Sequence, residues 1–200
     1  MLAGVSHDLR TPLTRVKLEL ALMPPGPARD SLAADVAEME HMIEGYLAFA
    51  RGEGRETPEL LDLELLIAEV VEQAARGGRK VSFRAEGTAE LELRPAAFRR
   101  ALANLIENGL VHGTQVAVTL LVSDRRVEVL VDDDGPGIPE EKREIVFKAF
   151  YRLEAERNPN RSGAGLGLTI ARDVARSHGG DVTLEESPAG GLRARMRLPR

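Results

Sequence analysis

Two stretches near the start of the chain carry apolar residues at alternating spacings of four and three positions. The first stretch has them at Val5, Leu9, Leu13, Val16 and Leu20, and the second at Leu32, Val36, Met39, Ile43, Tyr46 and Ala50. This spacing gathers apolar side chains on one face of an α-helix and is typical of coiled-coil packing. We therefore expect one helix over about residues 2–23 and a second over about residues 28–51.

The two predicted helices are separated only by Met23-Pro24-Pro25-Gly26-Pro27. This sequence stops a helix, because proline lacks the backbone N–H and clashes with the preceding turn. Two helices joined by so short a loop form an antiparallel hairpin. One hairpin buries little apolar surface, so we predict that two chains pair into a four-helix bundle. The alternative is a hairpin that packs on the C-terminal part of its own chain.

After the hairpin, residues 52–58 contain two glycines, a proline and no apolar periodicity, which is typical of a linker. The remaining chain alternates helical and strand patterns, as in an α/β protein. Helices are expected over about residues 61–75, 95–111 and 166–177, and strands over residues 81–84, 90–93, 115–122, 126–131, 182–185 and 192–198. We therefore expect a helical-hairpin dimerisation domain over residues 1–51, a linker over 52–58 and an α/β sandwich over 59–200.

An irregular stretch over about residues 135–165 interrupts this alternation and is rich in Gly, Pro, Asn and Arg. A segment of this length inside a compact domain is usually a mobile functional lid. Within it, residues 140–150 could form a short helix.

Composition narrows the class of protein without deciding its function. The 200 residues, 43% of them hydrophobic and 30% charged, suit one medium domain or two small ones. A net charge of −5 gives no general reason to expect nucleic-acid binding. The absence of cysteine excludes disulfides and thiolate chemistry, and no apolar run approaches the roughly 20 residues of a membrane helix.

The first candidate for chemistry is His7, which Asp8 follows directly and which Thr11 follows one helical turn later. A carboxylate that holds the Nδ1–H of a neutral imidazole leaves Nε2 free as a nucleophile or proton acceptor. The ordinary alternative is a surface or capping histidine near a helix N-terminus. Because this chemistry begins seven residues into the chain, we expect the natural protein to continue upstream.

A second group of candidates lies on the helix expected after Pro95, where Asn104 and Asn108 are four residues apart on one face. An amide oxygen is a suitable ligand for Mg²⁺, which binds few protein groups while phosphates and water fill its shell. The ordinary alternative is a polar helix face.

Two glycine-rich turns complete the candidates. Asp132, Asp133 and Asp134 end an apolar stretch and precede Gly135 and Gly137, so they could form a metal cluster, a solvated turn or a pocket for a planar ligand. An aspartate there can accept a hydrogen bond from an exocyclic amine such as that of adenine. The turn Gly163-Ala164-Gly165-Leu166-Gly167 leads into a helix, whose first backbone N–H groups favour an anion. It fits neither a Rossmann fingerprint nor a P-loop, because no strand precedes it and no lysine follows it.

These pieces together resemble a known family. Residues 3–14 are similar to the phospho-acceptor box of sensor histidine kinases of two-component systems, closest to the EnvZ type. Further along, four groups resemble the N, G1, F and G2 boxes of the family's ATP-binding domain, which has the GHKL (Bergerat) fold: Asn104 and Asn108; Asp134 with Gly135 and Gly137; Phe147 and Phe150; and Gly163, Gly165 and Gly167. The resemblance covers essentially the whole chain in the family's order.

The resemblance implies roles for these residues. His7 would accept the phosphoryl group, Asp8 would orient it and Thr11 would position water for a phosphatase reaction. Asn108 would be the Mg²⁺ ligand, Asn104 a supporting contact and Asp134 the residue that selects adenine. Gly135 and Gly137 would shape the adenine pocket, Gly163, Gly165, Leu166 and Gly167 would border the phosphates, Phe147 and Phe150 would anchor the lid, and Arg152 could supply charge near it.

Two positions depart from the family pattern. Val111 stands where a basic residue is common, and Ala164 stands where a hydroxyl is common, so phosphate holding could be weaker. His112, next to Val111, either stacks on adenine or is a surface histidine.

The activity that the resemblance implies is ATP-dependent autophosphorylation of His7 in a homodimer, with Mg²⁺, followed by transfer to an aspartate of a response-regulator receiver domain. The full-length protein would lie in the bacterial inner membrane with this part facing the cytoplasm, and no nucleic acid would bind. Two alternatives stay open: an ATP-sensing scaffold without kinase activity, and another enzyme on the same nucleotide fold, such as an ATPase or a serine kinase.

Overall fold

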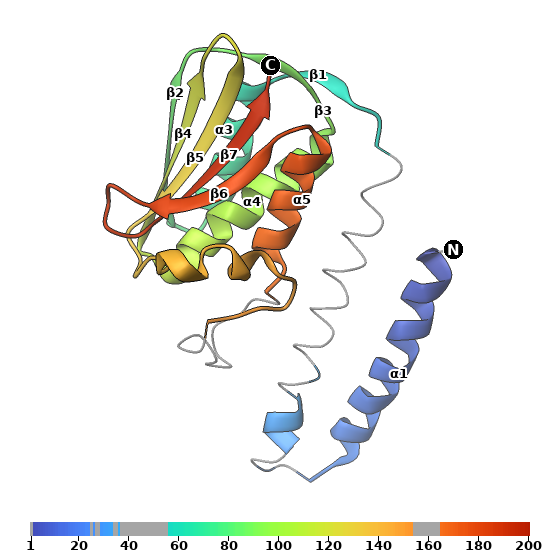
Figure 1. The fold of residues 1–200 in the computed structure, drawn as a ribbon. Coiled ribbons are helices and arrows are strands. Elements are labelled where there is room, and N and C mark those ends of the chain that lie inside the picture. The colour runs from blue at the N-terminus through green and yellow to red at the C-terminus, as the bar shows by residue number, and fades with distance from the viewer. Residues whose placement is uncertain (1, 25, 27–28, 34–35, 37–55, 154–164) are drawn as a thin grey trace.

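The computed structural model describes residues 2–24, 26, 29–33, 36, 56–153 and 165–200, with side chains in the first helix described from residue 12 onward (Figure 1). The chain begins with helix α1, Leu2–Leu22, which contains Pro12. It ends at the predicted stop sequence, and residues 29–33 beyond that sequence are helical again. The side chains of Leu13, Leu20 and Val36 form a small buried cluster. The predicted first helix is therefore confirmed, and most of the predicted second helix lies outside the described residues.

The C-terminal part opens with a strand that the sequence pattern did not predict. Strand β1, Glu59–Asp62, pairs antiparallel with β3, Glu90–Leu93, and places Leu61 opposite Leu91. Helix α3, Leu63–Ala75, follows at once, and the carboxylate of Asp62 accepts a hydrogen bond from the backbone N–H of Leu65 at 3.1 Å. The predicted helix start at Leu61 was wrong, because Asp62 caps the helix and the residues before it pair as a strand.

Five strands form the main sheet in the order β2-β4-β5-β7-β6. Their bounds are Lys80–Glu86 for β2, Gln115–Val122 for β4, Arg126–Asp133 for β5, Asp181–Glu186 for β6 and Leu192–Pro199 for β7. Strands β2 and β4 are parallel and the other neighbours are antiparallel. Each predicted strand is present, and β5 runs two residues further than expected, to Asp133.

One face of this sheet is covered by α3, by α4, Pro95–His112, and by α5, Gly167–Ser177 (Figure 1). The core between the layers includes Phe98, Leu102 and Ile106 of α4 and Met196 and Leu198 of β7, all 2% exposed or less. Alternate residues of each strand point into this core, as the period of a β-strand requires. The predicted α/β sandwich is confirmed.

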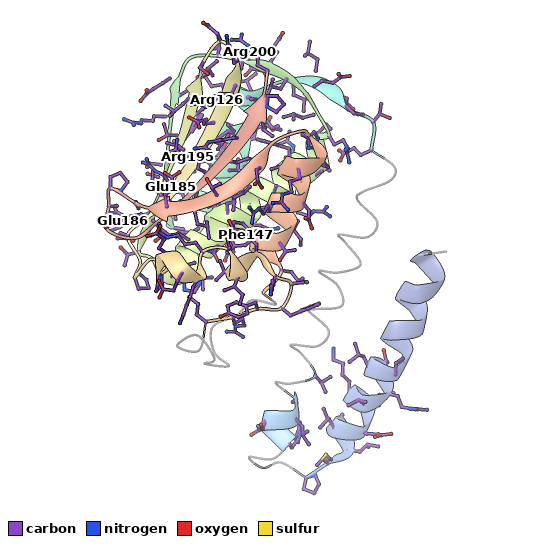
Figure 2. All side chains as sticks on the ribbon, viewed as in Figure 1. Arg126, Phe147, Glu185, Glu186, Arg195 and Arg200 are labelled. Atoms are coloured by element: carbon purple, nitrogen blue, oxygen red, sulfur yellow. The ribbon has the colours of Figure 1, made fainter. Side chains whose placement is uncertain are left out.

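The opposite face of the sheet carries paired charges instead of a second apolar layer. Arg195 donates two hydrogen bonds to Glu185 at 2.9 and 2.8 Å, and both residues are labelled along the sheet in Figure 2. Glu128 of β5 is 8% exposed and accepts from Arg197 at 2.9 Å. Burial raises the pKa of Glu128, but the hydrogen bonds from Arg197 and Arg195 outweigh burial and lower it. Among the described residues, the large apolar cluster therefore lies on the helix side of the sheet.

The segment after β5 contains two 3₁₀ turns, η1, Glu140–Lys142, and η2, Ile145–Phe147. The short helix that the sequence allowed over residues 140–150 is therefore absent as a continuous α-helix. In each turn the backbone bonds join residues three apart, as between Lys142 N–H and the Pro139 oxygen at 2.9 Å. Nowhere in the described part of the chain is a helix both long and apolar enough to span a membrane.

Candidate functional site

Asn104 lies where helix α4 meets the start of helix α5. Asn104 and Asn108 are half-buried and one turn apart in α4. A methyl group built at Gly167, the first residue of α5, would lie 3.7 Å from Cβ of Asn104. The Nδ2 group of Asn104 is buried and has no hydrogen-bond partner among the described residues. A buried amide without a partner is rare, so this group is suited to a bound polar ligand.

Three glycines surround Asp133 at the end of β5. A Cβ built at Gly109 of α4 would lie 3.3 Å from Cβ of Asp133, and a Cβ at Gly135 would lie 3.0 Å from its Oδ1. A Cβ at Gly191 would overlap the same Oδ1 atom and would approach the backbone nitrogen of Gly135 to 2.5 Å. Since real Cβ atoms do not approach so closely, only glycine fits at Gly191.

This packing fixes one oxygen of a nearly buried carboxylate. Asp133 is 5% exposed, and its Oδ1 accepts hydrogen bonds from the backbone N–H groups of Gly135 at 2.8 Å and Leu192 at 3.0 Å. Both bonds use the same oxygen, so Oδ2 is the acceptor that remains for a ligand.

Asp134, which the sequence interpretation chose as the adenine contact, is engaged elsewhere. Its Oδ1 accepts from the backbone N–H groups of Thr114 at 2.6 Å and Gln115 at 3.0 Å, and its Oδ2 accepts from the Thr114 hydroxyl at 2.6 Å. The hydroxyl bond first, and then the two backbone bonds, lower the pKa of Asp134 from 3.8 to about 2. Asp134 therefore ties the end of β5 to the turn between α4 and β4.

Because both carboxylate oxygens of Asp134 are engaged, we propose Asp133 in its place as the adenine contact. Two signals in the sequence could have found it. Val127, Val129 and Val131 face the core, and Asp133 continues that alternation, whereas Asp134 lies beyond the strand. In addition, the box that this stretch resembles has the spacing Asp-x-Gly-x-Gly, and the aspartate two positions before Gly135 is Asp133.

The alternative of a metal cluster at the three aspartates is not supported. Asp132 pairs with Arg193 through two hydrogen bonds of 2.8 and 3.0 Å, so each of the three carboxylates has a different partner. Among the described residues, no group of three or more His, Cys, Asp or Glu side chains could hold a metal ion. The amide oxygen of Asn108 is left as a donor for Mg²⁺, and a single oxygen donor fits an ion held mostly by phosphates and water.

The last residue of α4, His112, lies beside the glycine turn after Asp133. It is half-buried, and a Cβ at Gly135 would lie 2.9 Å from its carbonyl oxygen. The backbone at His112 thus contacts the glycine turn after Asp133. Gly137 further along that turn has a φ of 69°, which favours glycine, and a Cβ there would lie 3.3 Å from the Gly191 oxygen.

The turn before α5 is held by the segment that follows η2. The N–H of Phe150 donates to the Gly165 oxygen at 3.0 Å, and both residues have a φ of 65°. A Cβ at Gly165 would lie 3.1 Å from the backbone of Phe150, so the two segments are in close contact. Leu166 is buried and immediately precedes α5.

The two phenylalanines differ in burial. Phe147 is 8% exposed, and its carbonyl oxygen accepts from the hydroxyl of Thr169 at 2.8 Å. Phe150 is 52% exposed and contributes its backbone, so of the two side chains only that of Phe147 is buried, and the role of both as lid anchors stays a prediction. Arg152 is half-buried at the end of the described segment, and Gly163 lies outside the described residues.

The backbone of His7, Asp8 and Thr11 is helical within α1, as expected. Their side chains lie outside the described residues, so the contact between His7 and Asp8 stays a prediction.

Comparison with known proteins agrees with this arrangement. Residues 93–200 match the family described as histidine kinase-, DNA gyrase B- and HSP90-like ATPases, and residues 1–55 match the His Kinase A (phospho-acceptor) domain. The chain is 36% identical to the sensor histidine kinase GtrS of Pseudomonas aeruginosa over all of its own length and 41% of that protein. The curated relatives are longer proteins, of which this chain spans 41% to 48%.

Solved structures show the same fold. The crystal structure of the ATP-binding domain of PrrB from Mycobacterium tuberculosis is 34% identical, with a TM-score of 0.61, covering 71% of this chain and 96% of that one. The kinase domain of the E. coli osmosensor EnvZ, solved by NMR, is also 34% identical, with a TM-score of 0.56 over 73% of this chain and 91% of that one. The nucleotide-binding sandwich and the phospho-acceptor helix thus occur together in one chain, which belongs to the sensor histidine kinases.

Proposed function

We propose that this chain is a kinase core that transfers the γ-phosphoryl group of ATP to His7 and then to an aspartate of a response-regulator receiver domain. Two observations support the proposal. The carboxylate of Asp133 is packed among glycines between the end of α4 and the start of β7, and the amide of Asn104 on α4 lies beside the start of α5. These groups provide an adenine acceptor and a polar phosphate end in one site.

Adenine recognition is assigned to Asp133. Its Oδ1 is fixed by two backbone N–H groups, and Oδ2 can accept a hydrogen bond from the exocyclic amine of adenine. Because the carboxylate is nearly buried, such a bond would be worth more than one formed in water. A base without that amine would leave the acceptor unpaired, which provides selectivity.

The phosphates are assigned to the start of α5. Its first backbone N–H groups carry the positive end of the helix dipole, and the phosphates would lie close to the backbone of Gly165, Leu166 and Gly167. Asn108 would hold Mg²⁺ through its amide oxygen, and the ion would supply positive charge to the phosphate oxygens. Asn104, whose Nδ2 lacks a partner among the described residues, would donate to the nucleotide or its water.

The chemical step needs positioning more than covalent help. The transition state spreads charge over the phosphoryl oxygens, so fixed N–H dipoles and a well-placed nucleophile carry most of the catalysis. Nε2 of neutral His7 forms the new N–P bond while the bond between the γ-phosphorus and the bridging oxygen breaks and ADP leaves. Asp8 accepts a hydrogen bond from Nδ1–H, which selects the attacking tautomer and stabilises the positive charge that develops on the ring.

Further assignments complete the proposal. Residues 1–51 form the dimerisation and phosphotransfer domain, residues 52–58 the linker and residues 59–200 the ATP-binding domain. Two chains pair through the hairpins into a four-helix bundle, and the full-length protein is a membrane sensor with this part facing the cytoplasm. Its relatives are more than twice as long, so the sensed signal belongs to segments beyond those matched here.

The deciding experiment is incubation of the chain with Mg²⁺ and γ-labelled ATP, in parallel with the His7→Gln variant. We expect label that is acid-labile and base-stable, and that is absent from the variant. Equal labelling of both proteins would contradict His7 as the acceptor. ATP binding without any phosphoprotein would favour the scaffold, and rapid phosphate release without a phosphoprotein would favour an ATPase.

A second activity is proposed at Thr11, one turn after His7, where a hydroxyl can position water for dephosphorylation of the regulator. Thr11→Ala should lose phosphatase activity toward a phosphorylated receiver domain and keep autophosphorylation. Intact phosphatase activity in that variant would reject the role.

A further inference from the structure

Arg172 of α5 contacts two carboxylates and an aromatic ring. It donates to Asp181 of β6 from Nε at 2.8 Å and from Nη2 at 3.2 Å. It also donates to Glu144 from Nη1 at 2.8 Å, and its guanidinium lies over the ring of Phe147, 4.2 Å from the ring centre. Only 11% of the Arg172 side chain is exposed.

The contacts of Arg172 divide into an inner and an outer set. Asp181 begins β6 and belongs to the main sheet, and hydrogen bonds from Arg172 hold the pKa of Asp181 well below its usual range. Glu144 and Phe147 belong to the irregular segment around η2, which has no partner strand. A guanidinium can serve both sets because its fork presents several donors and its plane stacks on an aromatic ring.

The outer contacts of Arg172 lie in the segment that touches the turn before α5, where phosphate binding is proposed. Phe147 is labelled in Figure 2 beside the helices, and Thr169, one turn before Arg172, donates to its carbonyl oxygen at 2.8 Å. Three residues after Phe147, the N–H of Phe150 donates to the Gly165 oxygen at 3.0 Å, and a Cβ at Gly165 would lie 3.1 Å from the Phe150 backbone. The segment that Arg172 and Thr169 hold on α5 therefore touches the turn that precedes α5.

We propose that Arg172 is a positioning residue for the nucleotide: it fixes residues 144–150 on α5 and, through the bond between Phe150 and Gly165, sets the backbone of the phosphate-binding turn. In this proposal Arg172 acts through these residues and does not itself bind the nucleotide. The inference rests on the nucleotide site proposed above and extends it to a residue outside that site.

The same helix offers a matched control. Arg176, one turn after Arg172, also donates to Asp181, from Nε at 3.1 Å, and 55% of its side chain is exposed. Within the described part of the chain, Arg176 forms no hydrogen bond or ion pair with the segment around η2. Loss of Arg176 removes one of the two arginines that pair with Asp181 and leaves the segment around η2 in place.

The test measures ADP binding by calorimetry on the full 200-residue chain, so that no phosphoryl transfer is needed. For Arg172→Gln we expect ADP binding about tenfold weaker, whereas Arg176→Gln should stay within about twofold. Hydrogen exchange of the nucleotide-free proteins should rise over residues 144–150 in Arg172→Gln alone. Thermal melting of both variants separates this effect from a general loss of stability.

Unchanged ADP affinity in folded Arg172→Gln, or unchanged exchange over residues 144–150, would overturn the inference. If Arg172→Gln does not fold, Arg172→Lys decides, since an ammonium keeps the charge but cannot pair with both carboxylates and stack on Phe147. Wild-type affinity in Arg172→Lys would then overturn it. An unmodified chain that binds no ADP would instead contradict the proposed nucleotide site.

Discussion

The carboxylate of Asp133 accepts a hydrogen bond from the backbone N–H of Leu192 at 3.0 Å, although the two residues are 59 positions apart in the chain. This bond joins the end of β5 to the start of β7 and fixes the orientation of the carboxylate. It is the geometric reason for placing the adenine contact at Asp133.

The first prediction compares Asp133→Asn with Asp134→Asn. In Asp133→Asn the amide oxygen can keep the bonds from Gly135 and Leu192, but an NH₂ group replaces the oxygen that we propose as the acceptor for adenine. We expect ATP affinity to fall by about 2 kcal/mol, or roughly thirtyfold, because a buried hydrogen bond to a charged group is lost. Asp134→Asn should change it by less than about threefold, as measured by titration with a fluorescent ATP analogue. The opposite order would return the role to Asp134.

The second prediction concerns acid stability at Asp134. Its folded pKa of about 2 lies below the ordinary 3.8, so its contribution to stability is complete above 3.8 and is lost as the pH falls toward about 2. Across that window the unmodified chain should lose stability more steeply than Asp134→Asn, which has no carboxylate to protonate. Urea unfolding at a series of acidic pH values measures this, and parallel curves for the two proteins would contradict the assignment.

The third prediction uses two adjacent glycines. Gly190 has a φ of 92° and no atom within 4 Å of a built Cβ, so Gly190→Ala costs only backbone strain, about 1–2 kcal/mol. Gly191→Ala would push a methyl group into Asp133 and should cost about 2–3 kcal/mol, because the backbones of Asp133 and Gly135 beside it cannot move freely. Chemical unfolding gives both costs.

Nucleotide affinity separates the two glycine variants further. Only Gly191→Ala should weaken ATP binding, because only that change displaces the Asp133 carboxylate. Equal loss of affinity in both variants would indicate a general effect of the turn instead.

The fourth prediction concerns Glu56, which precedes β1. Its carboxylate accepts from the backbone N–H groups of Ala96 at 2.5 Å and Ala97 at 3.0 Å, in the first turn of α4. Arg94, the N-cap residue of α4, makes no side-chain capping bond, so Glu56 provides the cap from 40 positions away. Glu56→Ala should destabilise the domain by about 1–2 kcal/mol, by loss of the cap and of a negative charge at the helix N-terminus.

Glu59→Ala is the control for this change, because Glu59 is an exposed carboxylate in the same segment. Its unfolding free energy should stay within about 0.5 kcal/mol of the unmodified chain. Equal effects of the two substitutions would reject the cap.

The elements of this fold could be predicted because their signals are local. Apolar spacing in α1 and alternation in β4 and β7 follow from which side chains must be buried on one face. Strand β1 was missed because four residues are too few to show a clear alternation of apolar and polar side chains, and because its partner, β3, lies some thirty positions away. The helix allowed over residues 140–150 failed because that segment bonds to α5 through Thr169 and Arg172 instead of propagating its own turns.

The sequence by itself determined the family, the order of its boxes and the candidate side chains, because these depend on residue type and spacing along the chain. Only the tertiary structure decided that Leu192 fixes the Asp133 carboxylate, and that Glu56 caps α4. It also decided that Arg172 joins β6 to the segment before the phosphate turn. Each of these contacts joins segments distant in sequence or depends on the packing of glycines from several elements. No local pattern records them, since they exist only once the sheet register and the helix positions are set.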